Sequence, residues 1–282
     1  MNRDSYRQLA ARLLPAVLAA GQLEMSYFNT GLAVETKADR SPVTVADRAA
    51  EEIILASLAE VLPGIAVVAE EAFAAGHHPT LTDPFLLVDA LDGTKQFVSG
   101  HREFTINVAL VEGGQPVFGL IYAAALSDLL LTDGPGHALR AHLDPSGTVA
   151  TLDACNPTPI RVRPPPADGL IALQSRSRNL EVSNAFLNDF EIADRRRLGS
   201  SYKFCLIAAG EADIYPQLGD TREWDIAAGQ AILISAGGTI AGLDGTAMRY
   251  GKSGTDYLNP PFIASSAPLA ALRRVAVCGG PK

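Results

Sequence analysis

Two short apolar runs that end directly in carboxylates constrain the fold of this chain most. Residues 65–69 (Ile-Ala-Val-Val-Ala) are followed by Glu70 and Glu71, and residues 85–88 (Phe-Leu-Leu-Val) are followed by Asp89. Short apolar runs between breakers are typical of strands that are buried on both faces. If the two strands lie next to each other, their terminal acids come together. The sequence therefore predicts a buried sheet with an acidic site at the ends of its strands.

The second run continues into the segment Asp-Ala-Leu-Asp-Gly-Thr (residues 89–94). Carboxylates crowded at a strand end repel one another unless a hard cation neutralises them. Carboxylate, carbonyl and hydroxyl oxygens suit Mg²⁺, and the spacing of a calcium-binding loop is missing. Residues 95–97 can begin a helix whose first N–H groups attract an anion. These features predict metal-assisted phosphoryl transfer, with the alternative that the acids only cap strands and turns.

The N-terminal half carries the patterns of two helices and two hairpins. Apolar periodicity predicts helices over residues 5–28 and 45–62. Pro15 is expected either to kink the first helix or to end its first turn early, because proline lacks an N–H donor. Glycine-rich turns predict paired strands at residues 104–111 and 115–122, and again at 128–132 and 137–142.

The C-terminal half follows a different pattern, which begins after a proline-rich stretch at residues 156–166. The predicted order is a strand at 170–174, helices near 180–190 and 202–209, a strand at 212–215 and a helix at 225–236. Strands that alternate with helices favour an α/β organisation. We therefore predict a layered α/β fold with two subdomains, an α+β part over residues 1–155 and an α/β part over 156–282.

The charge of the chain limits its partners. There are 23 Lys and Arg against 31 Asp and Glu, a net charge of −8 at pH 7. Nucleic acid polymers are not expected as partners, because they are held by basic surfaces. A small phosphorylated ligand in a local basic or metal-loaded pocket is compatible with this charge. Three cysteines without metal-binding spacing, no leader peptide and no transmembrane segment predict a cytoplasmic location.

Three other motifs carry weaker signals. Residues 245–253 resemble a phosphate-binding P-loop, but five residues separate the glycines where that loop has four. The pair His77 and His78 has no further His or Cys nearby, which is typical of a solvated loop. Three consecutive arginines at residues 195–197 are also typical of a solvated surface, with the alternative that one of them contacts an anionic ligand.

Four separated blocks follow the pattern of a known family. The chain has Asp47, then Glu70-Glu71, then residues 89–94, then Trp-Asp-Ile-Ala-Ala at 224–228. In this order they resemble the lithium-sensitive phosphatase superfamily, which includes inositol monophosphatase and fructose-1,6-bisphosphatase. Within it, the segments at 41–47, 104–110, 199–205 and 258–262 are most similar to the bacterial 3′(2′),5′-bisphosphate nucleotidases. The resemblance covers roughly residues 5–265 and implies an inositol-monophosphatase-like αβαβα sandwich.

The resemblance implies a set of metal ligands that hold two or three Mg²⁺ ions. These ligands are Glu70, Asp89, Asp92, Asp225 and the Leu91 carbonyl, with the Thr94 hydroxyl assisting. One departure from the family pattern lies among them, because Ala90 stands where proline is usual. This change removes no ligand.

The resemblance also implies how the substrate is held and attacked. Asp47 is expected to pair with Thr94 and deprotonate the attacking water, with Glu70 as a further catalytic residue. The substrate-binding set is Glu70, Leu91, Asp92, Gly93, Thr94, Ser200, Lys203 and Asp225. In this set the Gly93 and Thr94 amides hold the scissile phosphate, and Ser200 and Lys203 lie near the nucleotide. Trp224 is expected to pack and so to position Asp225.

A second departure is Arg178, which stands where the nucleotidases often have histidine. It puts a nucleotide contact through that residue in doubt, although an arginine there can meet a phosphate instead. The implied function is a Mg²⁺-dependent phosphomonoesterase that converts adenosine 3′,5′-bisphosphate to AMP and phosphate. The alternatives are an inositol or sugar phosphatase and a sensor that binds the nucleotide without cleaving it. The expected partner is the nucleotide bisphosphate, and a homodimer is possible.

Overall fold

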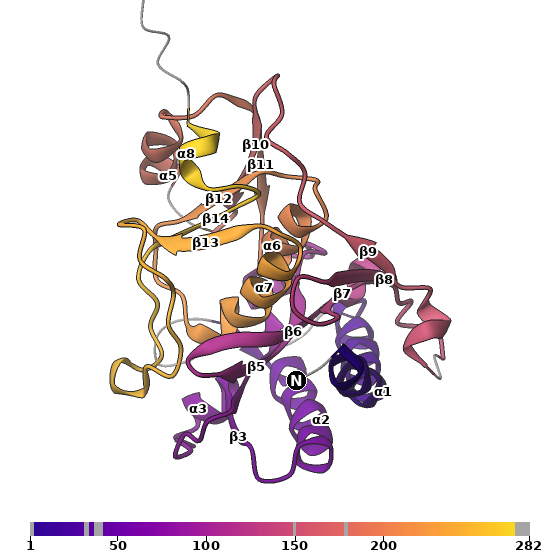
Figure 1. Cartoon of the computed structure of the whole chain (residues 1–282). Coiled ribbons are helices and arrows are strands. Elements are labelled where there is room, and N and C mark those ends of the chain that lie inside the picture. Colours follow the sequence, from indigo (N-terminus) through magenta and orange to yellow (C-terminus); the bar gives the residue numbers. More distant parts are fainter. Residues whose placement is uncertain (1–2, 31–33, 37–41, 149–150, 178–179, 274–282) are drawn as a thin grey trace, which may run out of the picture.

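The computed structural model describes residues 3–30, 34–36, 42–148, 151–177 and 180–273. It contains a seven-stranded sheet, a five-stranded sheet and a short two-stranded ribbon of β1 (Val34–Thr36) and β2 (Pro42–Thr44). Helices cover both faces of the two larger sheets (Figure 1). No helix in these described ranges is long and apolar enough to cross a membrane.

The larger sheet has the strand order β3-β4-β5-β6-β7-β8-β9. The bounds are β3 (Ala66–Ala69), β4 (Phe85–Asp92), β5 (Thr105–Glu112), β6 (Gln115–Ala123), β7 (Asp128–Thr132), β8 (Ala138–His142) and β9 (Thr158–Ile160). β3 runs parallel to β4, and the following pairs are antiparallel. Both predicted hairpins are confirmed, as β5 with β6 and β7 with β8. The acids of residues 89–92 lie within β4 instead of after it.

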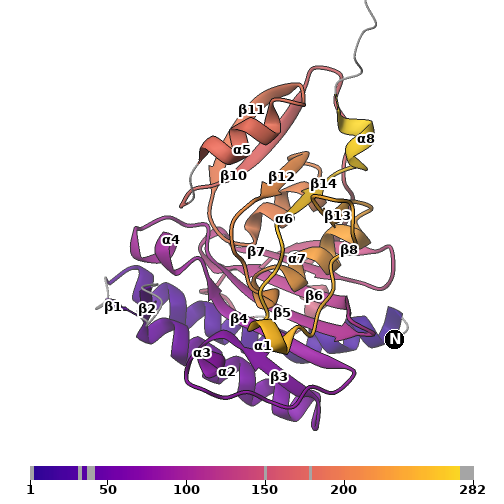
Figure 2. The same ribbon diagram turned by 90° about the vertical axis from the view of Figure 1, so that its left-hand side faces the viewer.

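One face of this sheet is covered by the two N-terminal helices, α1 (Arg3–Phe28) and α2 (Val45–Val61) (Figure 2). Alternate side chains of β4 explain how the strand is buried on both sides. Leu86 and Val88 pack into the core under these helices, whereas Phe85 and Leu87 pack into a second core on the opposite face. The apolar run that the sequence showed is therefore shared between two cores.

The second core contains helices α6 (Tyr202–Ala208) and α7 (Glu223–Ser235) and joins the two large sheets. The smaller sheet beyond it has the order β11-β10-β12-β14-β13. Its strands are β10 (Leu170–Ser175), β11 (Ile192–Leu198), β12 (Ile214–Gln217), β13 (Thr239–Gly242) and β14 (Phe262–Ser265). A third core packs α5 (Leu180–Leu187) and α8 (Leu269–Leu272) on its outer face.

The three cores define five layers, helix, sheet, helix, sheet and helix, as the αβαβα expectation requires. The described chain also has three 3-10 turns, η1 (Ala124–Leu126), η2 (Leu152–Cys155) and η3 (Ser253–Thr255). Strand β9 lies past the predicted division between residues 155 and 156 and still pairs with β8 in the larger sheet. The division into two subdomains stays a prediction of the sequence.

Helix α1 and strand β11 differ from the sequence expectation for reasons that burial explains. Helix α1 continues through Pro15, so the expectation that its first turn ends early at this proline is wrong. The helix loses one backbone hydrogen bond there, but Leu13, Leu14 and Val17 around it are almost completely buried, and this burial holds the helix together. The three arginines of residues 195–197 lie in β11, which the sequence did not predict, because five consecutive residues of this edge strand are exposed.

Candidate active site

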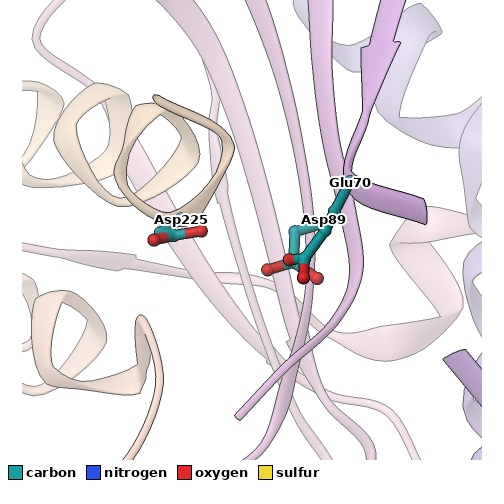
Figure 3. Close-up of side chains that lie close together, drawn as sticks. All are labelled: Glu70, Asp89 and Asp225. Carbon is teal, nitrogen blue, oxygen red and sulfur yellow. The ribbon is translucent and has the colours of Figure 1, made fainter. Parts of the chain in front are cut away.

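Three carboxylates from distant parts of the chain converge at one end of the larger sheet. Glu70 begins helix α3 (Glu70–Ala74) directly after β3, Asp89 lies within β4, and Asp225 is in the first turn of α7. One oxygen from each lies within 4.8 Å of the others. Figure 3 shows the Asp225 carboxylate facing the other two from the helix. The structure thus brings Glu70, Asp89 and Asp225 together, and we call these three residues the acidic cluster.

Local structure accounts for each position in the acidic cluster. The parallel register pairs Ala69 with Val88, so the next residues along the two strands, Glu70 and Asp89, emerge together. The carboxylate of Asp225 accepts a hydrogen bond from the Arg222 amide at 2.8 Å, which fixes it at the start of α7. Trp224 packs against Phe73 and Tyr257 with ring centroids 5.4 and 5.8 Å away, as expected for a residue that positions its neighbour.

The electrostatics of the acidic cluster call for a cation. Burial raises the pKa of Asp89 well above its ordinary value, and the charges of Glu70, Asp92 and Asp225 raise it further. The pKa of Asp225 is raised in the same way, by burial and then by Asp92 and Glu70. Deprotonating these groups together is unfavourable without a compensating positive charge. An all-oxygen donor set of this kind fits a hard divalent cation such as Mg²⁺.

Asp92 lies beside the acidic cluster and has a different environment. Its Oδ2 accepts a hydrogen bond from the Ser201 amide at 2.5 Å, directly before α6. Burial raises the pKa of Asp92 to about 6, although the nearby charge of Lys203 and the Ser201 amide act in the opposite direction. The structure therefore shows Asp92 as the link between the acidic cluster and α6. Its role as a metal ligand stays a prediction.

The expected pair of Asp47 and Thr94 is in direct contact. Thr94 donates its hydroxyl proton to Oδ1 of Asp47 at 2.9 Å and also lies 3.3 Å from the Leu91 carbonyl oxygen. The other oxygen of Asp47 accepts hydrogen bonds from the amide and the hydroxyl of Thr44 at 2.7 and 2.6 Å. Asp47 is only 3% exposed. Its carboxylate is therefore held in one orientation toward Thr94.

Gly93 forms the turn between β4 and helix α4 (Thr94–Val98), which confirms the helix start predicted at residues 95–97. Its φ of 95° lies in the left-handed region that favours glycine. A Cβ atom here would lie 3.2 Å from both the Glu103 carbonyl oxygen and the Ser200 Cβ. Glycine at this position thus allows the backbone to turn tightly against residues 199–201.

Ser200 and Lys203 lie next to Asp92, where α6 begins. Lys203 is only 3% exposed, and its Nζ donates to the Ser200 carbonyl oxygen at 2.5 Å and lies 4.9 Å from the centroid of the Tyr215 ring. Lys203 is therefore not a solvent-facing helix lysine, and its charge lowers the pKa of Asp92. Arg178, the other basic residue considered for the nucleotide, lies outside the described residues.

Sequence reasoning missed Glu24, a fully buried acid of α1. Neither of its carboxylate oxygens has a hydrogen-bond partner in the described part of the chain. Burial raises the pKa of Glu24 well above its ordinary value, and the charge of Asp47 adds to the effect. The signal was present, because Leu9, Leu13 and Val17 continue at helical spacing to position 24. A glutamate on the apolar face of a helix is unusual, because acidic side chains are rarely buried, and it indicates a buried ionisable group.

The fold and the acidic cluster define a family. The sequence profile described as the inositol monophosphatase family matches residues 5–277, and the chain belongs to this family. Among its relatives are proteins named 3′(2′),5′-bisphosphate nucleotidase CysQ. The one from Buchnera aphidicola is 33% identical over 264 residues, 93% of this chain and 95% of the relative. The one from Salmonella typhimurium is 35% identical over 86% of this chain and 94% of the relative.

Solved structures agree with the sequence comparison. A crystal structure described as CysQ from Bacteroides thetaiotaomicron, a bacterial member of the inositol monophosphatase family, has a TM-score of 0.72 at 32% identity. The match covers 90% of this chain and 96% of that one. An inositol monophosphatase from Thermotoga maritima has a TM-score of 0.70 at 24% identity, a likeness that concerns the fold alone. The layered fold expected from the sequence is confirmed.

Proposed function

We propose that this protein is a Mg²⁺-dependent 3′(2′),5′-bisphosphate nucleotidase that converts adenosine 3′,5′-bisphosphate to AMP and phosphate. The observation that carries the chemistry is the acidic cluster of Glu70, Asp89 and Asp225 together with the Asp47–Thr94 pair. These are the parts needed for metal-assisted hydrolysis of a phosphate ester. The nucleotide as substrate rests on the similarity to the CysQ relatives over most of both chains.

The residues of the acidic cluster would hold Mg²⁺ through their carboxylates, with Asp92 and the Leu91 carbonyl beside them. When bound, Mg²⁺ supplies Lewis acidity and lowers the pKa of a coordinated water. Thr94 orients the attacking water with its hydroxyl oxygen, because the hydroxyl proton is donated to Asp47. As the water attacks, Thr94 takes a proton from it and passes its own hydroxyl proton to Asp47, which acts as the general base. Glu70 belongs to the catalytic set through its place in the cluster.

We also propose how the substrate is oriented. The amides of Gly93 and Thr94 at the start of α4 hold the scissile phosphate. Ser200 and Lys203 contact the nucleotide, since they lie beside Asp92 at the start of α6. A local cation of this kind is needed because the whole chain carries a charge of −8. We further propose a cytoplasmic location, which the sparse cysteines favour, and a homodimeric assembly.

A comparison of three substrates tests the proposal. Phosphate release with Mg²⁺ would be measured for adenosine 3′,5′-bisphosphate, inositol-1-phosphate and fructose-1,6-bisphosphate. We expect kcat/KM to be highest for the nucleotide by at least about tenfold. Activity that is highest for inositol-1-phosphate would show a phosphatase with a different substrate. Tight nucleotide binding without release of phosphate would instead support the sensor.

A further inference from the structure

A cavity lies apart from the acidic cluster. It has a volume of about 580 Å³ and lies between residues 100–103, the end of β11 and helix α6. Its lining includes neither the acidic cluster nor Asp47 and Thr94. Small-molecule sites in proteins commonly have volumes of about 300–1,000 Å³, so this cavity is of a size to hold one organic ligand.

The floor and the rim of this cavity differ in chemistry. Leu126, Leu198 and Leu206 together with the ring of Tyr202 form an apolar floor, and all four are buried or half-buried. The rim carries basic side chains, His101, Arg102, Arg196 and Arg197. An apolar floor under a cationic rim suits a ligand that has a flat apolar part and an anionic group.

Within the part of the chain that the structure describes, the positive charge of the rim is largely uncompensated. Arg197 donates to the Arg176 carbonyl oxygen at 2.9 Å, and Arg102 donates to the Ala125 carbonyl oxygen. Neutral carbonyls leave both guanidinium charges in place. Arg196 pairs with Asp194 at 2.9 Å, but both side chains are strongly exposed, at 43% and 51%. Surface pairs of this kind are weak and exchange readily for a better partner.

One acid also lines the cavity, and its charge is already offset. The carboxylate of Glu103 is paired with Arg176, a residue that does not line this cavity. Although burial opposes it, this pairing keeps the pKa of Glu103 below its ordinary value. The cavity is therefore a positive region on a protein whose overall charge is −8. Such a local reversal concentrates anions at this position.

We infer that this cavity binds a nucleotide, with the base on the floor formed by Tyr202 and the leucines and the phosphates at Arg102, Arg196 and Arg197. Guanidinium groups bind phosphate oxygens through paired hydrogen bonds, and aromatic or leucine side chains pack against a base. This site needs no metal, in contrast to the acidic cluster. The inference does not depend on which substrate the active site cleaves.

Binding of ADP to the full chain tests this inference. Isothermal titration calorimetry would be run with excess EDTA, so that no divalent cation at the acidic cluster attracts the phosphates, and repeated with Mg²⁺. We expect one ADP per chain to bind in EDTA. Inorganic phosphate and adenosine are expected to bind more weakly than ADP, because each contacts only the rim or only the floor.

A charge reversal and its neighbour provide the matched pair of variants. Arg196→Glu should weaken ADP binding by at least about tenfold, because it replaces an attractive contact by a repulsive one. Arg195→Glu changes the net charge equally at an exposed residue that does not line the cavity. It should leave the affinity within about twofold. Thermal unfolding of both variants checks that they fold. If Arg196→Glu does not fold, Arg196→Gln replaces it as a milder change.

Three results would overturn the inference. The first is no heat of ADP binding at millimolar concentration. The second is an equal loss of affinity in Arg195→Glu and Arg196→Glu, which would indicate a general charge effect. The third is a dimer in sedimentation velocity that Arg196→Glu dissociates, because a second copy of the chain would then be the occupant of this face.

Discussion

The hydroxyl of Thr94 donates to Oδ1 of Asp47 at 2.9 Å, and the two residues are 47 positions apart in the chain. Asp47 is the third residue of α2, where its second oxygen closes a capping box with Thr44. The same carboxylate therefore caps the start of α2 and orients the hydroxyl at the start of α4. This double use fixes the geometry of the pair.

Removal of the Thr94 hydroxyl should slow catalysis strongly and leave the fold intact. Thr94→Val keeps the shape of the side chain but cannot orient water or pass a proton to Asp47. We expect kcat to fall by about 10²–10⁴-fold, the usual contribution of general acid–base catalysis. Steady-state kinetics with adenosine 3′,5′-bisphosphate as substrate measure this fall in kcat. Thr94→Ser, which keeps the hydroxyl, is the control and should retain most of the activity. A kcat of Thr94→Val within tenfold of the wild-type value (about 1.4 kcal/mol) would exclude this role of Thr94.

Glu24 should make the stability of the protein depend on pH. Its pKa is raised well above 4.5 by burial, and the unfolded chain has the ordinary value. Between these two values the folded state holds one proton more than the unfolded state, so stability falls as pH rises. The slope is at most about 1.4 kcal/mol per pH unit for one group.

Glu24→Gln removes that proton and should flatten the pH dependence by this amount. The measurement is urea unfolding of wild type and variant at several pH values between 5 and 8. Glu52→Gln, on the exposed side of α2, is the control and should follow the wild-type curve. Parallel curves for wild type and Glu24→Gln would show that Glu24 does not titrate in this way.

The acidic cluster was predictable because it depends on strand ends. Glu70 and Asp89 directly follow apolar runs, and the parallel pairing of such runs brings the next residues together. Asp225 was found through the family pattern, since spacing alone does not show that a helix far along the chain faces the sheet. A helix start was predicted at residues 95–97, and the helix begins at Thr94, one residue earlier.

Features that depend on tertiary contacts could not be predicted. The link from Asp92 to the Ser201 amide joins residues 109 positions apart, and no local pattern encodes it. Strand β11 carries three exposed arginines, so it lacks the apolar alternation that identifies a strand. The burial of Lys203 was also hidden, because a lysine in a helix is usually solvated.

Lys203 should contribute to recognition of the phosphate that is not cleaved. Lys203→Met keeps the length and apolar body of the side chain and removes its charge. We expect kcat/KM for adenosine 3′,5′-bisphosphate to fall about ten- to a hundredfold, as for loss of one charge-assisted contact. The loss on 3′-AMP, which has no second phosphate, should be small. Equal losses on the two substrates would show that Lys203 acts by stabilising Asp92. Lys203→Arg keeps the positive charge and changes the shape of the side chain, so it separates the two effects.

The raised pKa values of the acidic cluster predict opposite effects of pH with and without Mg²⁺. For Asp92 the pKa is raised to about 6, and for Asp89 and Asp225 burial raises the pKa well above its ordinary value. Each of these groups binds a proton more tightly in the folded state than in the unfolded state. In EDTA the free energy of unfolding should therefore fall as pH rises from about 5 to 8.

Added Mg²⁺ should reverse this trend, because it replaces the protons and binds the deprotonated carboxylates. At a Mg²⁺ concentration of about a hundred times Kd we expect Tm at pH 8 to rise by about 5–10 °C over the EDTA value. The rise should be much smaller at pH 5, where protons compete with the metal. Asp225→Asn removes one ligand and one repelling charge, so its Tm in EDTA should be higher than that of wild type and its response to Mg²⁺ weaker. Differential scanning fluorimetry at constant ionic strength measures all four conditions, and an equal Mg²⁺ response at pH 5 and pH 8 would contradict a carboxylate site.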